Sequence, residues 1–186
     1  EACVRIKRST SPRDALPDAA NWLDTSVVGQ RWVDSERVGK RIGVRLSMTA
    51  LLIHLGMTGR WIRSEQPEHR FCRLALRLDD AYWICFLDTR RFGGIVPATG
   101  SLHAALQEGL GPDAMTSPWT GPMLQQCIRG KRGIKVALMD QKNIAGLGNI
   151  HATEVLWKCH IHPHRSCATL TATEWERLAK EIPKHL

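Results

Sequence analysis

The spacing of apolar residues changes part-way along this chain of 186 residues, and that change constrains the fold more than any other feature. In the first part, short segments alternate apolar and polar residues, as in Ile-Gly-Val-Arg-Leu at residues 42–46. After Gly111 and Pro112 the apolar residues recur at helical spacing instead. Strands and helices in separate stretches of sequence indicate an α+β fold, with a β domain followed by a helical one.

Several short segments of the first part have the character of β-strands, and turn residues separate them. Asp79-Asp80-Ala81 lies between the last two of these strands and predicts a hairpin. Pro12 and Pro17 indicate a loop over residues 9–17. Short strands with intervening turns are typical of a sandwich or a barrel. The predicted strands are residues 4–7, 42–46, 50–54, 74–78 and 82–87.

About four helices are predicted in the second part. Ser117-Pro118 places a proline at the first position of a helix that runs to about residue 129. Apolar spacing predicts helices over residues 134–143 and 149–159, and the second has an apolar side formed by Ile150, Val155 and Leu156. Thr171 and Glu174 have the spacing of a capping box at the start of the fourth helix.

Charge and composition narrow the possible partners and compartment. Lys and Arg number 26 against 18 Asp and Glu, which gives a net charge of +8 and favours a polyanionic partner, nucleic acid first. A merely soluble basic protein is the alternative. No apolar stretch approaches the length of a membrane span, and no signal peptide is visible. The six cysteines form no C-x-x-C pair, so we expect reduced, mostly buried thiols and a cytoplasmic protein.

A glycine-rich turn at residues 145–149, Ala-Gly-Leu-Gly-Asn, lies directly before a predicted helix. The free backbone N–H groups at the start of such a helix can hold a phosphate, and Asn149 adds a side-chain donor. A simple turn is the alternative explanation.

Two further loops carry residue types suited to DNA. Arg90 and Arg91 followed by Phe92 suit phosphates, base edges and stacking, and Met57 lies at a loop tip where an apolar wedge is useful. The alternatives are a solvated charged loop with one buried phenylalanine and a methionine of the core. The run from residue 159 to 167 collects cysteines and histidines, but its spacing fits no zinc pattern, so we expect no metal site there.

Taken together and in order, these motifs resemble the formamidopyrimidine-DNA glycosylase family. The resemblance covers nearly the whole chain and is weakest before Gly29. The chain resembles the related endonuclease VIII branch less closely. It is carried by Leu-Ile-His-Leu-Gly-Met-Thr-Gly at 52–59, Asp-Thr-Arg-Arg-Phe-Gly at 88–93, Ile-Lys-Val-Ala-Leu-Met-Asp-Gln at 134–141 and Gly-Leu-Gly-Asn-Ile at 146–150.

This resemblance implies an N-terminal antiparallel β-sandwich, residues 1–112, followed by an all-helical helix–two-turn–helix domain, residues 113–186. It implies binding of double-stranded DNA that contains an oxidised base or an abasic site, by a bacterial, cytoplasmic monomer with no membrane association. The implied activity is excision of oxidised purines such as 8-oxoguanine and formamidopyrimidines, followed by strand cleavage at the abasic site. The damaged nucleotide is flipped out of the stack.

The family's residue roles carry over to matching positions. Met57 fills the space left by the flipped base, Arg90 faces the orphaned partner base, and Phe92 wedges beside it. The remaining matches are Lys40, His54 and Asn149 as phosphate contacts, Arg91 as a further phosphate candidate, and Lys135 as a contact of the oxidised base.

The chain departs from the family pattern at both ends. The family's nucleophile is the amine of an N-terminal proline next to a glutamate, whereas this chain opens Glu1-Ala2-Cys3. It stops at Leu186, without the family's C-terminal zinc finger. We therefore expect a fragment that lacks the front helix, the nucleophile and the zinc, and that is inactive as it stands. No lysine obviously replaces the nucleophile, and Lys40 is the only alternative amine that we name, as the nearest by motif.

Two other functions stay open at this point. One is a catalytically inactive module that recognises damaged DNA, which differs from the enzyme only in what precedes Glu1. The other is an RNA-binding protein, because helix–two-turn–helix units also occur in ribosomal proteins. A duplex wedge made of Met57, Arg90 and Phe92 has no use on single-stranded RNA and argues against it.

Overall fold

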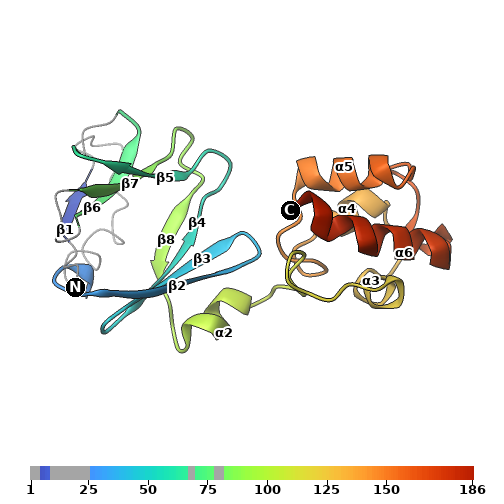
Figure 1. Cartoon of the computed structure of the whole chain (residues 1–186), viewed down its shortest axis with the longest axis horizontal. Coiled ribbons are helices and arrows are strands. Elements are labelled where there is room, and N and C mark those ends of the chain that lie inside the picture. Colours follow the sequence, from blue (N-terminus) through green and yellow to red (C-terminus); the bar gives the residue numbers. More distant parts are fainter. Residues whose placement is uncertain (1–4, 9–25, 67–69, 78–81) are drawn as a thin grey trace. The chain divides into compact units, whose positions relative to one another are not determined.

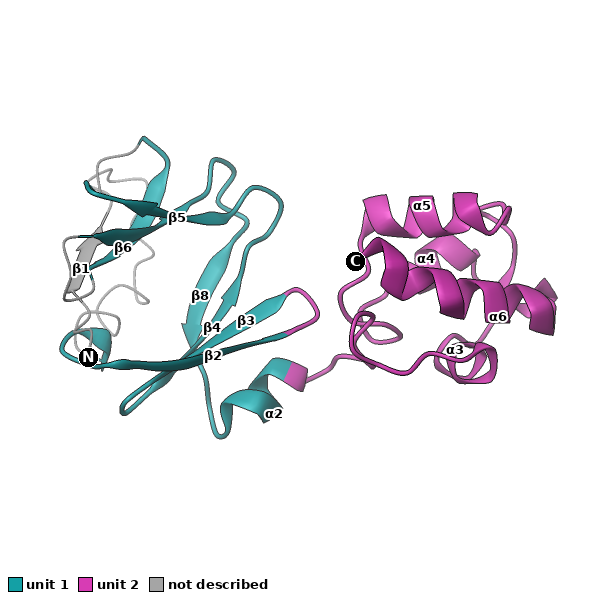
Figure 2. Cartoon of the chain, viewed as in Figure 1, with its two compact units in different colours: residues 1–37, 41–106 teal, residues 38–40, 107–186 magenta. Residues whose placement is uncertain are grey.

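The computed structural model describes residues 5–8, 26–66, 70–77 and 82–186 (Figure 1). The chain forms two compact units (Figure 2). The first unit consists of residues 1–37 and 41–106, and the second of residues 38–40 and 107–186. The first holds the strands and the second holds helices α3 to α6, which confirms the expected α+β fold class.

The described residues of the first unit form two four-stranded sheets, and every strand pair whose register is known is antiparallel. The order of one sheet is β1-β6-β7-β5 and that of the other is β2-β3-β4-β8. A register shift between Cys72 and Leu74 interrupts the β6–β7 ladder. The strands are β1 (Arg5–Arg8), β2 (Trp32–Val38), β3 (Arg41–Leu46), β4 (Ala50–His54), β5 (Arg60–Ser64), β6 (Cys72–Arg77), β7 (Trp83–Leu87) and β8 (Gly94–Pro97).

Alternating residues of the two sheets meet in one apolar core, which makes this unit a sandwich. From one sheet come Val44, Leu51 and Ile53, and from the other come Leu74 and Phe86, among others, all nearly inaccessible to solvent. This arrangement follows from the period-two pattern of the sequence, because every second side chain of a strand points to the same face.

A short helix, α2 (Leu102–Gln107), packs against β3 at Gly43. A Cβ atom at Gly43 would lie only 2.8 Å from the Cδ1 atoms of both Leu102 and Leu106. The glycine therefore lets the helix approach the sheet closely. Neither this helix nor strands β2, β5 and β8 were predicted from the sequence.

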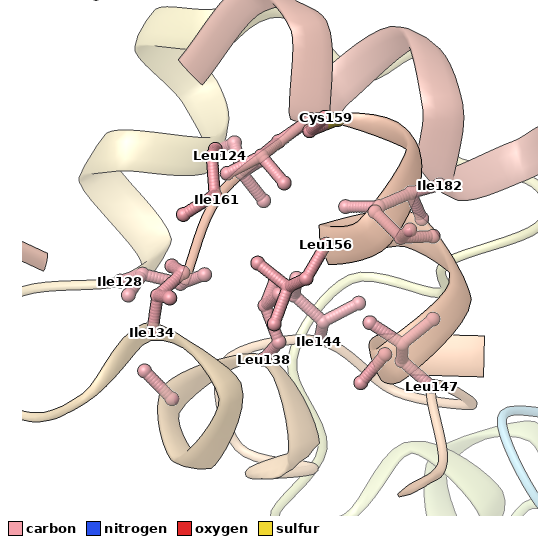
Figure 3. Close-up of a cluster of buried hydrophobic side chains, with 14 of the residues drawn as sticks. Leu124, Ile128, Ile134, Leu138, Ile144, Leu147, Leu156, Cys159, Ile161 and Ile182 are labelled. Carbon is pink, nitrogen blue, oxygen red and sulfur yellow. The ribbon is translucent and has the colours of Figure 1, made fainter. Parts of the chain in front are cut away.

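The second unit is a helical bundle around one apolar core. Figure 3 shows its side chains pointing toward one another, with Leu138, Leu156 and Ile182 from three different elements. Trp175 is the largest fully buried side chain in this core. The elements are α3 (Gly121–Cys127), α4 (Ile134–Met139), α5 (Asn149–Lys158), η2 (Cys167–Thr169), α6 (Ala172–Glu181) and η3 (Ile182–His185).

The capping box is confirmed. The predicted start of the first helix, at Ser117-Pro118, is wrong. At the start of α6, Thr171 Oγ1 accepts from the backbone N–H of Glu174, and the Glu174 carboxylate accepts from that of Thr171. Helix α3 starts after Thr120, because the Thr120 hydroxyl accepts from Met123 N–H and caps the helix there. The indole N–H of Trp119, just before this cap, donates to the carbonyl of Ala114.

Two further helix predictions need correction. Helix α4 ends at Met139 rather than at residue 143, because the Asp140 carboxylate accepts from Lys142 N–H and closes a turn. Helix α5 does bury Val155 and Leu156, but Ile150 is 72% exposed. The predicted loop at 9–17 and the turn at 79–81 lie outside the described residues.

Among the described residues, five cysteines are free thiols, and all but Cys127 are buried. Burial raises the pKa of Cys72 to about 12 and that of Cys159 to about 11. No helix in the described part of the chain has both the length and the apolar character needed to cross a membrane.

Candidate nucleic-acid interface

Asp88 organises the loop that carries the arginine pair. It directly follows β7 and is 1% exposed. Its carboxylate accepts from the hydroxyl of Thr58 and from the backbone N–H groups of Arg90 (3.1 Å) and Gly93 (2.7 Å). Burial alone would raise the pKa of this carboxyl, but the hydrogen bonds outweigh it and hold the pKa below the usual value. Asp88 is therefore an ionised, buried anchor for two loops at once.

The backbone of Asp88 is itself hydrogen-bonded to β6 and to the residue just before that strand. Its N–H donates to Phe71 O over 3.0 Å, and its carbonyl accepts from Arg73 Nε over 2.8 Å. In the sequence, Asp88 stands within the motif at 88–93, but no role was predicted for it. The signal available in the sequence was an aspartate directly after a predicted strand and just before a turn.

The two apolar residues of the expected wedge, Met57 and Phe92, are exposed. Met57 is 70% exposed and Phe92 is 52% exposed. The guanidinium carbon of Arg90 lies 4.9 Å from the centre of the Phe92 ring, within the range of a cation–π contact. At Gly56, which has φ of 60°, a Cβ atom would come within 2.5 Å of the Phe92 carbonyl carbon. The two loops thus touch each other, and Met57 follows directly after this contact.

Two predicted phosphate contacts lie in the same unit. His54 ends β4 as an exposed residue, and its imidazole lies over Gly94, where a Cβ atom would meet Nε2 at 2.6 Å. Arg91 is exposed and has a left-handed backbone with φ of 58°. This conformation is uncommon outside glycine and indicates that the Asp88 loop dictates the backbone there.

Lys40 belongs to the second unit, together with Val38 and Gly39. The backbone N–H of Gly39 donates to the carboxylate of Asp113 over 2.6 Å. Gly39 has φ of 57°, and a Cβ atom there would lie 3.0 Å from that of Ala145. The turn that carries Lys40 is therefore held tightly against residues 113 and 145.

The ammonium group of Lys40 reaches the start of α5. A Cβ atom at Gly148, the N-cap residue, would lie 3.0 Å from Lys40 Nζ. Partial burial lowers the pKa of the Lys40 amine. Asn149 is the first residue of α5 and is exposed, and no acidic residue occupies the first turn. Lys40 and Asn149, expected as phosphate contacts, thus flank a helix start whose N–H groups attract anions.

Gln141 holds the glycine-rich turn in place. Its side-chain amide donates to the carbonyls of Met139 and Leu147, both over 2.9 Å, and its oxygen accepts from Gly146 N–H over 2.9 Å. Neither Gln141 nor Asp113 was assigned a role from the sequence. The partners of Gln141 lie two to six residues away, whereas Asp113 accepts from Gly39 on a distant segment. Only the Gly-Pro before Asp113 indicated a fixed turn in the sequence.

Lys135 lies in the first turn of α4 and is half-buried. Its backbone N–H donates to Pro163 O over 3.1 Å, so the backbone of this residue is fixed. The structure places the predicted site residues in two groups, one in each unit. His54, Met57, Arg90, Arg91 and Phe92 belong to the first, and Lys40, Lys135 and Asn149 to the second.

The cysteine–histidine run is part of the helical core and a neighbouring loop. Cys159, Ile161 and Cys167 are buried, while the rings of His162 and His164 lie 5.6 Å apart on the surface. Within the described part of the chain no group of three or more His, Cys, Asp or Glu side chains is arranged to hold a metal ion.

Comparison with known proteins decides the family. Residues 2–95 match the formamidopyrimidine-DNA glycosylase N-terminal domain, and residues 110–186 match the H2TH domain of the same glycosylase. The chain belongs to the formamidopyrimidine-DNA glycosylase family.

Relatives with this family name come from several bacteria. The protein of Gluconobacter oxydans is 39% identical over 174 residues, a match that covers 88% of this chain and 62% of the relative. The protein of Marinomonas sp. is 32% identical over 191 residues, and the match covers 69% of that relative's length. The chain thus spans about three-fifths of the length of the first relative.

Solved structures show the same fold. The formamidopyrimidine-DNA glycosylase of Lactococcus lactis, non-covalently bound to DNA with an abasic site, superposes with a TM-score of 0.84 at 24% identity. The match covers 99% of this chain and 72% of that one. A second complex of the L. lactis protein with abasic-site DNA gives a TM-score of 0.85, also at 24% identity.

Proposed function

We propose that this chain recognises damaged positions in duplex DNA, as part of a base-excision-repair glycosylase and abasic-site lyase that removes oxidised purines. The substrates would be 8-oxoguanine and formamidopyrimidines. The observation that carries the proposal is the exposure of Met57 and Phe92 on two loops that one buried carboxylate, Asp88, fixes in place.

Exposed apolar side chains on rigid loops suit a wedge. Unstacking a base step costs a few kcal/mol, and an apolar side chain inserted at the step offsets part of that cost. Because the Asp88 hydrogen bonds already order the loops, little conformational entropy is lost when Met57 and Phe92 enter the duplex. Arg90, stacked on Phe92, is placed to donate to the base left without a partner.

Phosphate contacts would keep the duplex in register. In the second unit, Lys40 and Asn149 flank the start of α5, and we assign them phosphates near the lesion. In the first unit, His54 and Arg91 take the same role. In the second unit, Lys135 is assigned to the oxidised base. Residues 1–112 would then carry the wedge together with Lys40, His54 and Arg91, and residues 113–186 would carry Lys135 and Asn149.

The wedge is tested by comparing two duplexes that differ only in one abasic site. Phe92→Ala and Met57→Ala should each reduce the preference for the abasic duplex about tenfold, the equivalent of about 1.4 kcal/mol. Binding to the intact duplex should stay near its starting level. Val96→Ala is the matched control, since Val96 is 51% exposed in the same unit but on β8. Equal losses on both duplexes would refute the wedge.

Borohydride trapping separates the enzyme from the lesion-binding module. Lyase chemistry in this family passes through an imine between an enzyme amine and the sugar, and borohydride reduces that imine to a stable adduct. The lowered pKa of Lys40 is in the direction that a nucleophilic lysine needs. An adduct that disappears in Lys40→Ala would assign the lyase to Lys40. Absence of an adduct would leave this 186-residue chain as a binder of damaged DNA.

A further inference from the structure

Positive charge in the helical unit is concentrated in two segments, residues 129–135 and 158–167. Together they contain six Lys and Arg, three His and no Asp or Glu. The rest of residues 107–186 contains four Lys and Arg against seven Asp and Glu. The surplus positive charge of this part of the chain therefore lies wholly in these two segments.

Backbone hydrogen bonds join the two segments. Ile134 N–H donates to Arg165 O over 2.9 Å, and Cys167 N–H donates to Arg132 O over 3.0 Å. The hydroxyl of Ser166 donates to the carbonyl of Lys131 over 3.1 Å. Residues far apart in sequence thus form one fixed basic surface, defined here by Lys131, Lys135, His162 and His164.

The acidic residues beside this surface are already paired. Asp140 forms an ion pair with Arg132 at 3.0 Å, and Glu174 with Arg165 at 2.5 Å. Hydrogen bonds from Lys142 and Arg132 lower the pKa of Asp140. In the described part of the chain, no ion pair engages Lys131, so its charge is available to an external anion.

The histidines add hydrogen-bond donors next to the lysines. Pro163, which lies between them, accepts the backbone N–H of Lys135 over 3.1 Å. His162 Nδ1 accepts from His164 N–H over 3.4 Å, so in the neutral ring the proton is on Nε2. Both side chains are exposed, and the Nε2–H of His162 is left to donate outward.

We propose that the basic surface is a second phosphate-contacting region, in which Lys131, His162 and His164 bind the backbone of duplex DNA beyond the lesion. This rests on the proposed DNA-binding function and extends its footprint. Phosphodiesters fit because they are acceptors only, and because the surface offers cationic groups and N–H donors without free carboxylates.

The test measures the salt dependence of binding to an intact duplex, with the full chain and its variants. Lys131→Gln should lower the magnitude of the slope of log K against log[salt] by about 0.9. Between 50 and 200 mM salt, the variant should therefore lose about 3.5-fold less affinity than the starting protein. Lys131→Arg should restore the slope. His162→Gln combined with His164→Gln should weaken binding to intact and abasic duplexes alike.

Lys180→Gln is the matched control. Lys180 is an exposed lysine of α6, 4.0 Å from Glu176, and its removal changes the net charge by the same amount. Its slope should equal that of the starting protein. An unchanged slope for Lys131→Gln, or an equal change for Lys180→Gln, would overturn the proposal. Either result leaves the abasic preference and its loss in Phe92→Ala untouched, so the two proposals fail separately.

Discussion

Replacing Asp88 with asparagine tests the reasoning about the two loops most directly. Asparagine has nearly the same shape, but one of the two carboxylate oxygens becomes an NH2 group. In the variant, one oxygen can still accept from Thr58 and Arg90. The new NH2 group replaces the oxygen that accepts from Gly93 N–H over 2.7 Å in the starting protein, so two donors face each other. A buried donor is left unsatisfied, and the two retained hydrogen bonds lose their charged acceptor.

The magnitude follows from these losses. An unsatisfied buried donor costs about 1–3 kcal/mol, and hydrogen bonds to charged groups are worth about 1 kcal/mol more than neutral ones. Because two hydrogen bonds lose their charged acceptor, Asp88→Asn should lower the free energy of unfolding of the first unit by about 3–5 kcal/mol. The preference for abasic over intact duplex should fall as well, because Arg90 and Phe92 lose their fixed loop.

Urea denaturation followed by circular dichroism measures the first effect, and competition between the two duplexes measures the second. Asp34→Asn is the control, because it makes the same chemical change at an exposed carboxylate paired with Arg45 at 2.8 Å. Exposed pairs of this kind contribute little to stability. A loss for Asp88→Asn no larger than that for Asp34→Asn would refute the anchor role.

The pH dependence has a defined sign. Burial would raise the pKa of Asp88, but its hydrogen bonds outweigh burial and hold that pKa below its ordinary value in the folded chain. Its contribution to stability is then fully present well above that value, and is lost as the pH falls through the folded pKa. The starting protein should lose stability below about pH 4. Asp88→Asn should lack this part of the acid dependence in the same urea experiments.

Three further outcomes are expected. Thr171→Ala removes half of the capping box and should destabilise the helical unit by about 1 kcal/mol, measured by urea denaturation. Gly56→Ala adds left-handed strain of about 1–2 kcal/mol and a clash with the Phe92 backbone, so it should cost about 3 kcal/mol and reduce abasic preference. Lys40→Gln should lower the salt slope by about one unit on both duplexes, and an unchanged slope would remove Lys40 from the phosphate contacts.

Features that depend on neighbouring residues could be predicted from the sequence. The alternation at 42–46 and the short apolar run at 50–54 predicted strands that the structure has as β3 and β4. Alternation is a local signal because side chains on a strand change face at every residue. The capping box of Thr171 and Glu174 was predictable for the same reason, since its hydrogen bonds span only three residues. The order of β domain and helical domain followed from the change of period.

Features that depend on contacts between distant segments were decided by the tertiary structure alone. Ile150 has the spacing of a core residue, yet it is exposed because the core of the helical unit packs against Ala152, Val155 and Leu156 instead. Strand β8 and helix α2 carry weak patterns of their own and are stabilised by their neighbours β4 and Gly43.

The candidate interface shows the same division. The sequence by itself determined which residue types stand at the loop tips, including Met57 and Phe92, because they occur in continuous motifs. Only the tertiary structure showed that Lys40 reaches Gly148. It also showed that Asp113, 74 residues from Gly39, accepts from Gly39 N–H and holds the turn that carries Lys40. Such contacts form when the chain buries its apolar faces. No local pattern of residues encodes which distant donors and acceptors that burial brings within hydrogen-bonding distance.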